Sequence, residues 1–274
     1  MSLRVMTWNL WWHFGPWKDR WPLIVETIRD VDPDVLFLQE VWSDESDDDA
    51  QRLADALGRS MVRTDPVLWN GASFGNAIVS RWPMRRLADE RLPNADGSPG
   101  HRRVVAAEVD SPYGRWPVAS THLEHRFDRS TVRQAQVRRV MQHALDWRGD
   151  PTVDLPLVVG GDLNAVPDAE EIRQATGRSA GVDGIVFSDV WEQAGDGSSG
   201  ATWLRANPFS RDSAWPDRRL DYLLVSWPRP TPVGNPIRSW LVGRRSPDDP
   251  LWPSDHLAVA ADLTTPDEPA PSTP

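Results

Sequence analysis

Val158–Pro167 reads V-V-G-G-D-L-N-A-V-P and decides how the rest of the chain is interpreted. A short apolar run from Leu155 to Val159, broken only by Pro156, predicts a buried strand because it is β-branched and ends at two glycines. The glycines are expected to allow a tight turn, since they carry no Cβ atom. Asp162 and Asn164 then follow the strand, where ligands bind in α/β sheets. Both are also ordinary turn residues, so the pair alone does not establish a site.

Other predicted strands end in the same way. Leu3–Trp8 leads to Asn9, Asp34–Gln39 leads to Glu40, and the second strand of a predicted hairpin (103–109 and 115–120) leads to Thr121 and His122. Two further strands, Leu220–Val225 and Leu257–Leu263, contain or follow polar groups. The eight polar residues at or just inside strand ends are Asn9, Glu40, His122, Asp162, Asn164, Asp221, Asp255 and His256.

This set combines hard oxygen donors with two imidazoles. Such donors suit Mg²⁺ or Mn²⁺, which prefer carboxylates, water and substrate phosphate. Zinc is less well matched, because no H-E-x-x-H or comparable histidine spacing occurs. A Walker loop and a G-x-S-x-G motif are also missing from the sequence, which removes support for a nucleotide motor or an α/β-hydrolase.

The composition favours one globular domain. The chain has 274 residues, 39% of them hydrophobic and 26% charged, and no linker divides it before a proline-rich end. We therefore predict a domain over residues 1–264 and a disordered tail over 265–274. The absence of cysteine excludes disulfides, thiol catalysis and cysteine-ligated metals.

Net charge and hydropathy limit the classes of partner that the protein is expected to bind. The net charge of −10 argues against non-specific binding to long nucleic acid, although a local basic groove stays possible. Part of this charge lies in Asp44–Asp49, which is interpreted as a solvated loop and helix start. The sequence has no apolar run of membrane-spanning length and no signal-peptide pattern at its start, so we expect a cytoplasmic protein. We also expect a monomer. Several of the sixteen tryptophans fall in predicted loops, where exposed aromatic rings suggest ligand contact.

The remaining elements follow from periodicity. Helical spacing predicts helices that begin at Trp21–Pro22 and near Asp47, Arg129 and Asp168, and end near Val31, Leu57, Trp147 and Thr176. Further strands are expected at Gly75–Ser80 and Ile237–Val242.

Six short motifs occur in a fixed order. They are T-W-N-L at 7–10, L-Q-E-V at 38–41, S-T-H-L at 120–123, G-D-L-N at 161–164, R-L-D-Y at 219–222 and S-D-H-L at 254–257. Together they resemble the endonuclease/exonuclease/phosphatase superfamily, the metal-dependent phosphoesterases related to deoxyribonuclease I. The resemblance implies an α/β (α+β) fold: a four-layered sandwich in which two mixed β-sheets pack face to face with helices outside.

The resemblance also implies roles for the residues in these motifs. Glu40 matches the principal metal ligand, Asn9 assists with metal or phosphate, and Asp255 lies at or near the metal. Asp162 matches the residue that orients or deprotonates the attacking water. The resemblance leaves open which group is the general base and which is the general acid.

Four further residues complete the implied catalytic set. Asn164 would hold the nucleophile and a phosphate oxygen, and His122 would donate to phosphate or the leaving oxygen. His256, paired with Asp221, would contact the phosphate, where a neighbouring carboxylate fixes the imidazole tautomer and favours its charged form.

Two residues are candidates for phosphate or substrate contact, each with a structural alternative. Arg103 lies where related enzymes have an arginine near phosphate, but a surface salt bridge explains it equally. Asn76 recurs in phosphatase-like relatives, but a structural turn is as good an explanation. We favour structural roles for Arg133 and Gln136. The histidines interpreted as ordinary are His13, His101, His125 and His143, with His125 as the strongest exception because it lies near His122.

The leading interpretation is a Mg²⁺-dependent hydrolase of a phosphodiester or phosphomonoester. The alternative is a nuclease for DNA or RNA, and a catalytically silent binding protein of the same fold is the third. Arginines and tryptophans at 203–219 support the nuclease, whereas overall acidity opposes it. The substrate would be selected by three loops, Trp11–Trp21, Asn94–His101 and Ala201–Asp217.

Overall fold

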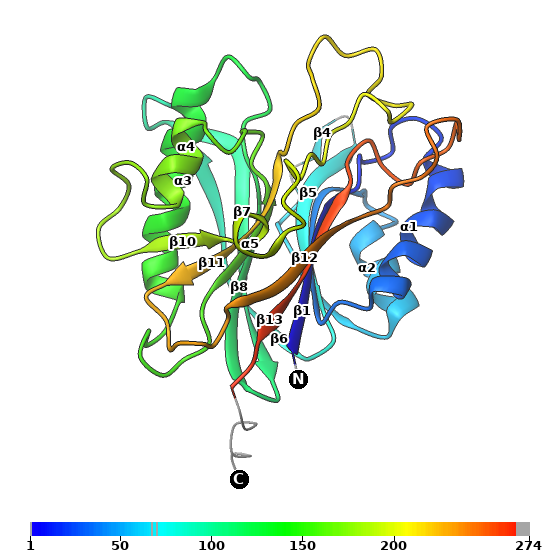
Figure 1. Ribbon diagram of the computed structural model, residues 1–274. Helices are drawn as coiled ribbons and strands as arrows, with labels where there is room; N and C mark the ends of the chain where they lie inside the picture. Colours follow the sequence, from blue (N-terminus) through cyan, green and yellow to red (C-terminus); the bar gives the residue numbers. More distant parts are fainter. Residues whose placement is uncertain (1, 67, 70, 267–274) are drawn as a thin grey trace.

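The computed structural model describes residues 2–66, 68–69 and 71–266. Two β-sheets face each other, and helices cover their outer faces (Figure 1). The prediction of a four-layered α/β sandwich is confirmed. The predicted tail falls largely on residues 267–274, which lie outside the described residues. None of the helices in the described part of the chain combines the length and apolar character needed to cross a bilayer.

The first sheet has seven strands in the order β12-β13-β1-β2-β5-β3, with β4 paired to β5. Only β1 and β2 are parallel in this sheet, and the other described pairs are antiparallel. Its strands are β1 (Ser2–Asn9), β2 (Val35–Ser43), β3 (Ser60–Arg63), β4 (Leu68–Trp69), β5 (Ala72–Ser80), β12 (Pro236–Val242) and β13 (Ala258–Thr264).

The second sheet has six strands in the order β10-β11-β9-β8-β7-β6. Here β8 and β9 form the parallel pair among otherwise antiparallel neighbours. Its strands are β6 (Met84–Pro93), β7 (Pro99–Ser111), β8 (Gly114–His122), β9 (Val158–Asp162), β10 (Val186–Asp189) and β11 (Asp221–Trp227).

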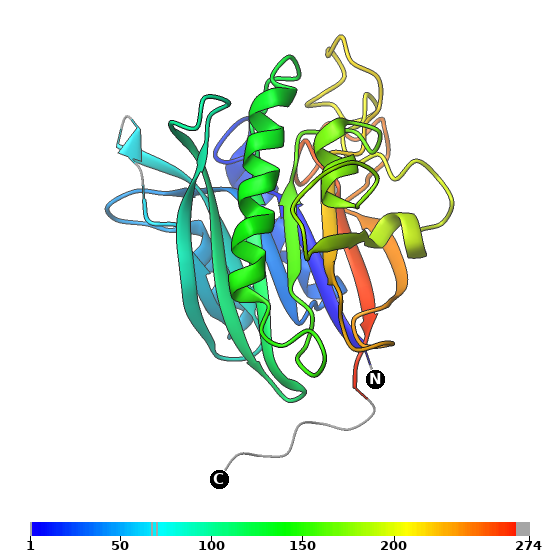
Figure 2. The ribbon, with the colours of Figure 1, turned by 90° about the vertical axis from the view of Figure 1, so that its left-hand side faces the viewer.

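Three apolar clusters hold the four layers together. Side chains such as Phe37 and Val105 fill the space between the sheets. A second cluster joins the second sheet to α3 (Ser130–Trp147) and α4 (Glu170–Ala175), and α3 lies along that sheet in Figure 2. A third joins the first sheet to α1 (Trp17–Val31) and α2 (Asp49–Leu57). The short helix α5 (Val190–Ala194) follows β10.

The parallel pairs explain why the polar residues meet. Asn9 pairs with Gln39 where the parallel pairing of β1 with β2 ends, and His122 pairs with Asp162 at the ends of β8 and β9. Parallel strands end at the same edge of a sheet. Asp221 begins the antiparallel strand β11 opposite Asp162, so it reaches that edge too. We call the ends carrying Asn9, His122, Asp162 and Asp221 the site edge; in Figure 1 it lies opposite the start of β1.

Two predicted boundaries are wrong for identifiable reasons. Helix α1 begins at Trp17, so Pro22 lies inside it instead of opening it. Strand β2 does not end before Glu40: a bulge between Leu38 and Val41 places Glu40 at φ 53°, and the strand resumes to Ser43. The sequence reading also missed β3 and β6, whose charged and small residues give no clean alternation.

The two glycines that end the predicted strand do not form a turn. Both lie within β9, which continues to Asp162. A Cβ atom on Gly160 would lie 2.6 Å from the Cβ atom of Phe37, and one on Gly161 would overlap the carbonyl oxygen of Thr121. Gly160 is needed because the first sheet approaches it too closely for a side chain, and Gly161 because the neighbouring strand β8 does. Neither is needed for a turn.

We predict that Gly160→Ala lowers the free energy of unfolding by about 1–3 kcal/mol, the usual cost of overpacking a core. Phe37→Ala made in the Gly160→Ala background should cost less than the sum of the two single losses, because it removes Cγ and Cδ2, two of the three Phe37 atoms that the new methyl group meets. Urea denaturation of the two single variants and the double variant measures the effect. Additive losses in the double variant would show that Phe37 is not the source of the conflict.

Candidate active site

A single amide group links the two sheets at the site edge. The side-chain nitrogen of Asn9 donates to the Glu40 Oε1 atom and to the Asp162 Oδ2 atom, both at 3.0 Å. The Asn9 side-chain oxygen accepts the backbone N–H of Trp11 at 2.9 Å. Asn9 is therefore fixed in one orientation, and it holds a carboxylate of the first sheet close to a carboxylate of the second.

His256 forms a buried pair with Asp221. Its Nδ1 atom lies 2.8 Å from Asp221 Oδ2, and the hydroxyl of Thr202 donates to the same oxygen at 2.5 Å. Thr202 also accepts the backbone N–H of Asp221 at 3.3 Å. The other ring nitrogen, Nε2, lies 3.9 Å from Asp162 Oδ2. The Nδ1 side of the imidazole is thus fixed by Asp221, while its Nε2 atom is directed to the site edge.

His122 and Asn164 surround Asp162 from the second sheet. The Nε2 atom of His122 lies 3.5 Å from Asp162 Oδ2. The backbone N–H of Asn164 donates to Asp162 Oδ1 at 2.9 Å, and its side-chain amide donates to the carbonyl of Leu123 at 3.3 Å. Asp162 is consequently held through both oxygens, as a residue that orients a small ligand must be.

The acidic groups of the site are crowded. Burial and the charge of Asp255 raise the pKa of Glu40 to about 8. Burial and the charge of Asp221 raise the pKa of Asp162 to about 6. Burial also raises the pKa of Asp255. Each raised pKa means that the ionised form of the carboxyl group is disfavoured here unless a cation compensates its charge.

The two histidines respond in opposite directions. Burial lowers the pKa of His256, but Asp221, Asp255 and Asp162 outweigh burial and hold this pKa well above its ordinary value. Burial and the charge of Arg102 hold the pKa of His122 well below its ordinary value. The surroundings therefore favour the charged form of His256 and the neutral form of His122.

The donor set fits a divalent metal ion. No ion pair among the described residues engages Glu40 or Asp255, although both are acidic groups of the same crowded cluster. Ligand atoms of Asp162, Asp221 and His256 also lie within 4.8 Å of one another. Because His256 already hydrogen-bonds to Asp221, Glu40 and Asp255 are the donors most available to a cation, with Asn9 beside them. Hard oxygen donors of this kind match Mg²⁺ or Mn²⁺.

Left-handed backbone conformations concentrate at the site. Within the described ranges, five non-glycine residues have positive φ, and four of them are Trp11, Trp12, Glu40 and Asn164, at 57°, 39°, 53° and 50°. Such residues cost free energy and persist where the surrounding structure determines them. The backbone N–H of Trp12 donates to the Glu40 carbonyl at 3.0 Å, so the aromatic loop and the bulge in β2 support each other.

Arg20 clamps the loops on either side of this region. Its buried guanidinium donates to five carbonyls at 2.8–3.1 Å, four of them in the loop after β1 and the fifth on Pro253, two residues before Asp255. The sequence reading missed Arg20, because its partners are backbone atoms that no motif reveals. The carbonyls belong to Leu10, Trp11, Trp12, Phe14 and Pro253.

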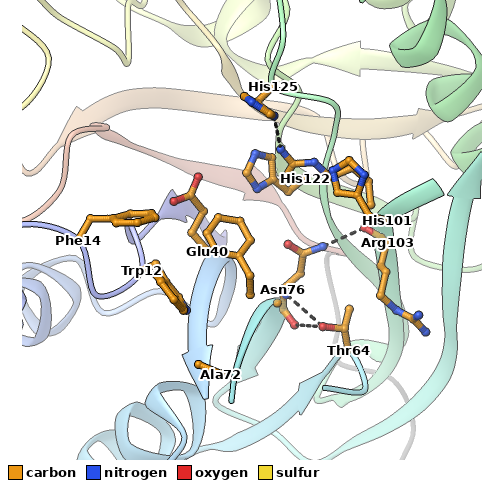
Figure 3. A pocket seen from close by; sticks show the side chains of 13 residues that line it. Trp12, Phe14, Glu40, Thr64, Ala72, Asn76, His101, Arg103, His122 and His125 are labelled. Carbon is orange, nitrogen blue, oxygen red and sulfur yellow. Dashed lines mark hydrogen bonds between the residues drawn. The ribbon is translucent and has the colours of Figure 1, made fainter. Parts of the chain in front are cut away.

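A cavity of about 660 Å³ opens beside the site edge. In Figure 3, Trp12 and Phe14 lie on one side of Glu40, and His101 and Arg103 lie on the other. His122 also contributes to the lining, so the cavity adjoins the residues that the motifs identify. Two of the predicted substrate-selecting loops, Trp11–Trp21 and Asn94–His101, supply part of its wall.

The adjacent arginines have different surroundings. The Nε atom of Arg103 donates to Asp89 Oδ1 at 2.7 Å, and in Figure 3 its side chain points away from Glu40. This contact matches the salt bridge that was the structural alternative for Arg103. Both arginines contribute to the cavity lining, but Arg102, which is 7% exposed and donates to His125 Nδ1, makes no ion pair among the described residues. The sequence does not reveal which of the two guanidiniums is already paired.

The other uncertain candidates are placed as follows. Asn76 lines the cavity, which is compatible with substrate contact, and its amide donates to the Arg103 carbonyl at 2.9 Å, which is a structural contact. Arg133 pairs with Glu171 and donates to carbonyls of the loop after β8, which holds that loop in place. His125 lines the cavity, which is the position that a role in the site would need. The remaining structural contacts are Gln136 with Glu124, His13 stacked on Trp17 and Trp42, and His143 stacked on Trp147.

Comparison with known proteins identifies related sequences. Residues 6–256 match the Endonuclease/Exonuclease/phosphatase family. Protein angel of Drosophila melanogaster is 28% identical over 180 residues, which cover 62% of this chain and 50% of that protein. The chain therefore spans about half the length of this curated relative.

Solved structures share the fold. An endonuclease/exonuclease/phosphatase from Beutenbergia cavernae is 27% identical, with a TM-score of 0.71 over 96% of this chain and 72% of that chain. TDP2 from D. rerio, complexed with a single-strand DNA product, is 20% identical, with a TM-score of 0.73 over 96% of this chain and 99% of that chain.

We predict that Arg20→Lys lowers the free energy of unfolding by about 2–4 kcal/mol, because an ammonium has three donors and leaves buried carbonyls without partners. Arg29→Lys is the matched control, since Arg29 lies on the same helix and makes one exposed hydrogen bond to the Ala56 carbonyl. Its effect should stay within about 0.5 kcal/mol. Urea denaturation compares the two, and equal losses would contradict the clamp.

Proposed function

The chain belongs to the endonuclease/exonuclease/phosphatase family, whose members hydrolyse phosphoester bonds, and from this premise we propose a metal-dependent phosphodiesterase or phosphomonoesterase in which an activated water attacks phosphorus in line. One observation carries the proposal. The buried His256–Asp221 pair and the Asn9-bridged carboxylates Glu40 and Asp162 converge on one site edge from both sheets.

The attacking water would be held by the second sheet. Asp162 keeps one oxygen on the Asn164 backbone and the other toward Asn9, His122 and His256. A carboxylate fixed in this way can orient a water molecule and accept its proton. The side chain of Asn164 would add a donor to the phosphate, in the role that its motif suggests.

The developing charge on phosphate would be stabilised by His256. Asp221 accepts a hydrogen bond from Nδ1, which leaves the Nε2 proton free to donate to a phosphoryl oxygen. Thr202 holds Asp221 by donating to the same carboxylate. His122 and Arg102 line the adjacent cavity, and we propose Arg102 for the phosphate contact first considered for Arg103, because Arg103 is already paired with Asp89.

We propose Mg²⁺ or Mn²⁺ as the metal, with Glu40 and Asp255 as its carboxylates and Asn9 beside it. When bound, such an ion polarises a phosphoryl oxygen and neutralises charge as the phosphorus is attacked. The raised pKa values of Glu40 and Asp255 support the assignment, since a cation would relieve the repulsion between these groups.

A nuclease is the second candidate. The guanidinium of Arg218 lies over the rings of Phe127 and Trp215 at 4.4 and 4.3 Å, and Trp215 is 45% exposed. Exposed aromatic rings with arginine are suited to stacking with bases. The likeness in fold to TDP2, which was crystallised with a single-strand DNA product, agrees with this candidate.

The metal requirement gives the first functional prediction. Hydrolysis of bis-p-nitrophenyl phosphate should disappear in excess chelator and return with Mg²⁺ or Mn²⁺. Glu40→Gln should raise the metal concentration for half-maximal activity by at least about tenfold. Glu26→Gln, an exposed change on α1, is the control and should leave this concentration unaltered. Full activity in chelator would refute the metal-dependent mechanism.

The His256–Asp221 pair gives the second. His256→Ala should lower kcat at least about 10²-fold with little change in KM, because the imidazole acts on charge that develops in the transition state. Asp221→Asn should cause a smaller loss, since it misorients an imidazole that is still present. The double variant should lose much less than the product of the single losses, because the two residues act as a unit. Steady-state kinetics of all three variants decide between this result and multiplicative, independent effects.

A further inference from the structure

One wall of the cavity is aromatic and partly exposed. The rings of Trp12 and Phe14 lie 5.2 Å apart, and those of Trp12 and Phe74 lie 5.9 Å apart. Phe14 and Phe74 are 43% and 42% exposed, which is unusual for large apolar side chains in a well-packed domain. The indole N–H of Trp12 donates to the Ser73 carbonyl at 2.9 Å, so the central ring of this wall is fixed.

The opposite wall carries one buried cation, Arg102, between His101 and His125. Burial lowers the pKa of both histidines, and Arg102 makes no ion pair with a carboxylate among the described residues. The Nε atom of Arg102 is buried without an acceptor, and its one side-chain hydrogen bond goes to His125 at 3.2 Å. Burial lowers the pKa of Arg102. The lowered pKa indicates that the neighbouring groups do not fully compensate the charge of the guanidinium. A buried arginine with an unused donor calls for an anionic partner.

The two walls together define the chemistry of the ligand. A planar apolar group suits the rings of Trp12, Phe14 and Phe74, and an attached anion suits Arg102. The volume of about 660 Å³ lies within the ~300–1,000 Å³ of ordinary small-molecule sites. A sugar phosphate without a base would place its hydroxyl groups against rings that offer no hydrogen-bond partner.

We propose that this cavity binds one nucleotide unit of a single-stranded nucleic acid substrate, with the base stacked on Phe74, Trp12 and Phe14 and a phosphate of the same unit on Arg102. The inference rests on the proposed function and names its substrate class. Glu40 and His122 also line the cavity, so the bound unit lies next to the scissile phosphoester. A base that is paired in a duplex must leave its stack before it can enter such a pocket, which is why the strand is single.

The test measures binding separately from catalysis. Two phosphorothioate-linked trimers, trithymidylate and the same trimer with abasic residues, are titrated into the whole protein in Mg²⁺ by calorimetry. The trimers carry equal charge and differ only in their bases. We expect trithymidylate to bind at least about tenfold more tightly, the ratio that about 1.4 kcal/mol of base stacking produces.

Variants assign this preference to the two walls. Phe74→Ala should remove most of the preference for bases, and Phe74→Tyr should retain it because the ring remains. Arg102→Met should weaken both trimers by a similar factor, since it removes a phosphate contact. Trp227→Ala, which changes a 55% exposed tryptophan in β11, is the matched control and should alter neither affinity.

Equal affinities for the two trimers, no measurable binding of either, or an unchanged preference in Phe74→Ala would each overturn the inference. Hydrolysis of bis-p-nitrophenyl phosphate is assayed in parallel. If it proceeds while the trimers fail to differ, the nucleotide pocket is wrong and the phosphoesterase stands. If it fails while trithymidylate is preferred, the pocket stands and the proposed reaction is wrong.

Discussion

Four carboxylates gathered at one end of a two-sheet sandwich impose the constraint on which the site depends. Asp162 and Asp221 are almost fully buried, and Glu40 and Asp255 lie beside them. Buried charge of one sign costs several kcal/mol per ion unless it is compensated. The protein supplies one amide from Asn9, the imidazole of His256 and the nearby guanidiniums of Arg20 and Arg102. The pKa values of Glu40, Asp162 and Asp255 stay raised despite these groups. A divalent cation held by these carboxylates would compensate the remaining charge, so the acidity of the site is itself an argument for metal chemistry.

The fold makes this crowding possible by bringing strand ends together from both sheets. Each sheet contains one parallel pair, and both pairs end at the site edge. The sheets approach closely because Gly160 faces Phe37 without a side chain. Glu40 reaches its position through a bulge with a left-handed backbone, which Trp12 supports through the Glu40 carbonyl and Arg20 supports through the loop carbonyls. Loops outside the motifs therefore determine the geometry of residues within them.

The resemblance carried by six short motifs implied the architecture, and the same motifs contained the polar residues that the structure brings together at the site edge. The sequence explained the glycines of β9 by a turn, since a sequence shows that a side chain is missing but not which neighbour excludes it. It could not separate Arg102 from Arg103, because the difference is set by Asp89 and His125, which lie 14 and 23 residues away along the chain. The role of Arg20 could not be predicted from the sequence either, because its partners are main-chain carbonyls, which every residue has. Long-range contacts of this kind have no local signal.

The central claim is that the site edge directs a water molecule to phosphorus. The most direct measurement is hydrolysis of bis-p-nitrophenyl phosphate in water enriched in oxygen-18, followed by mass spectrometry of both products. The account predicts one heavy oxygen in p-nitrophenyl phosphate and none in p-nitrophenol, because the bond that breaks joins phosphorus to the leaving oxygen. Label in p-nitrophenol would place the attack on carbon, and unlabelled p-nitrophenyl phosphate would show that water is not the nucleophile. Either result would contradict the account.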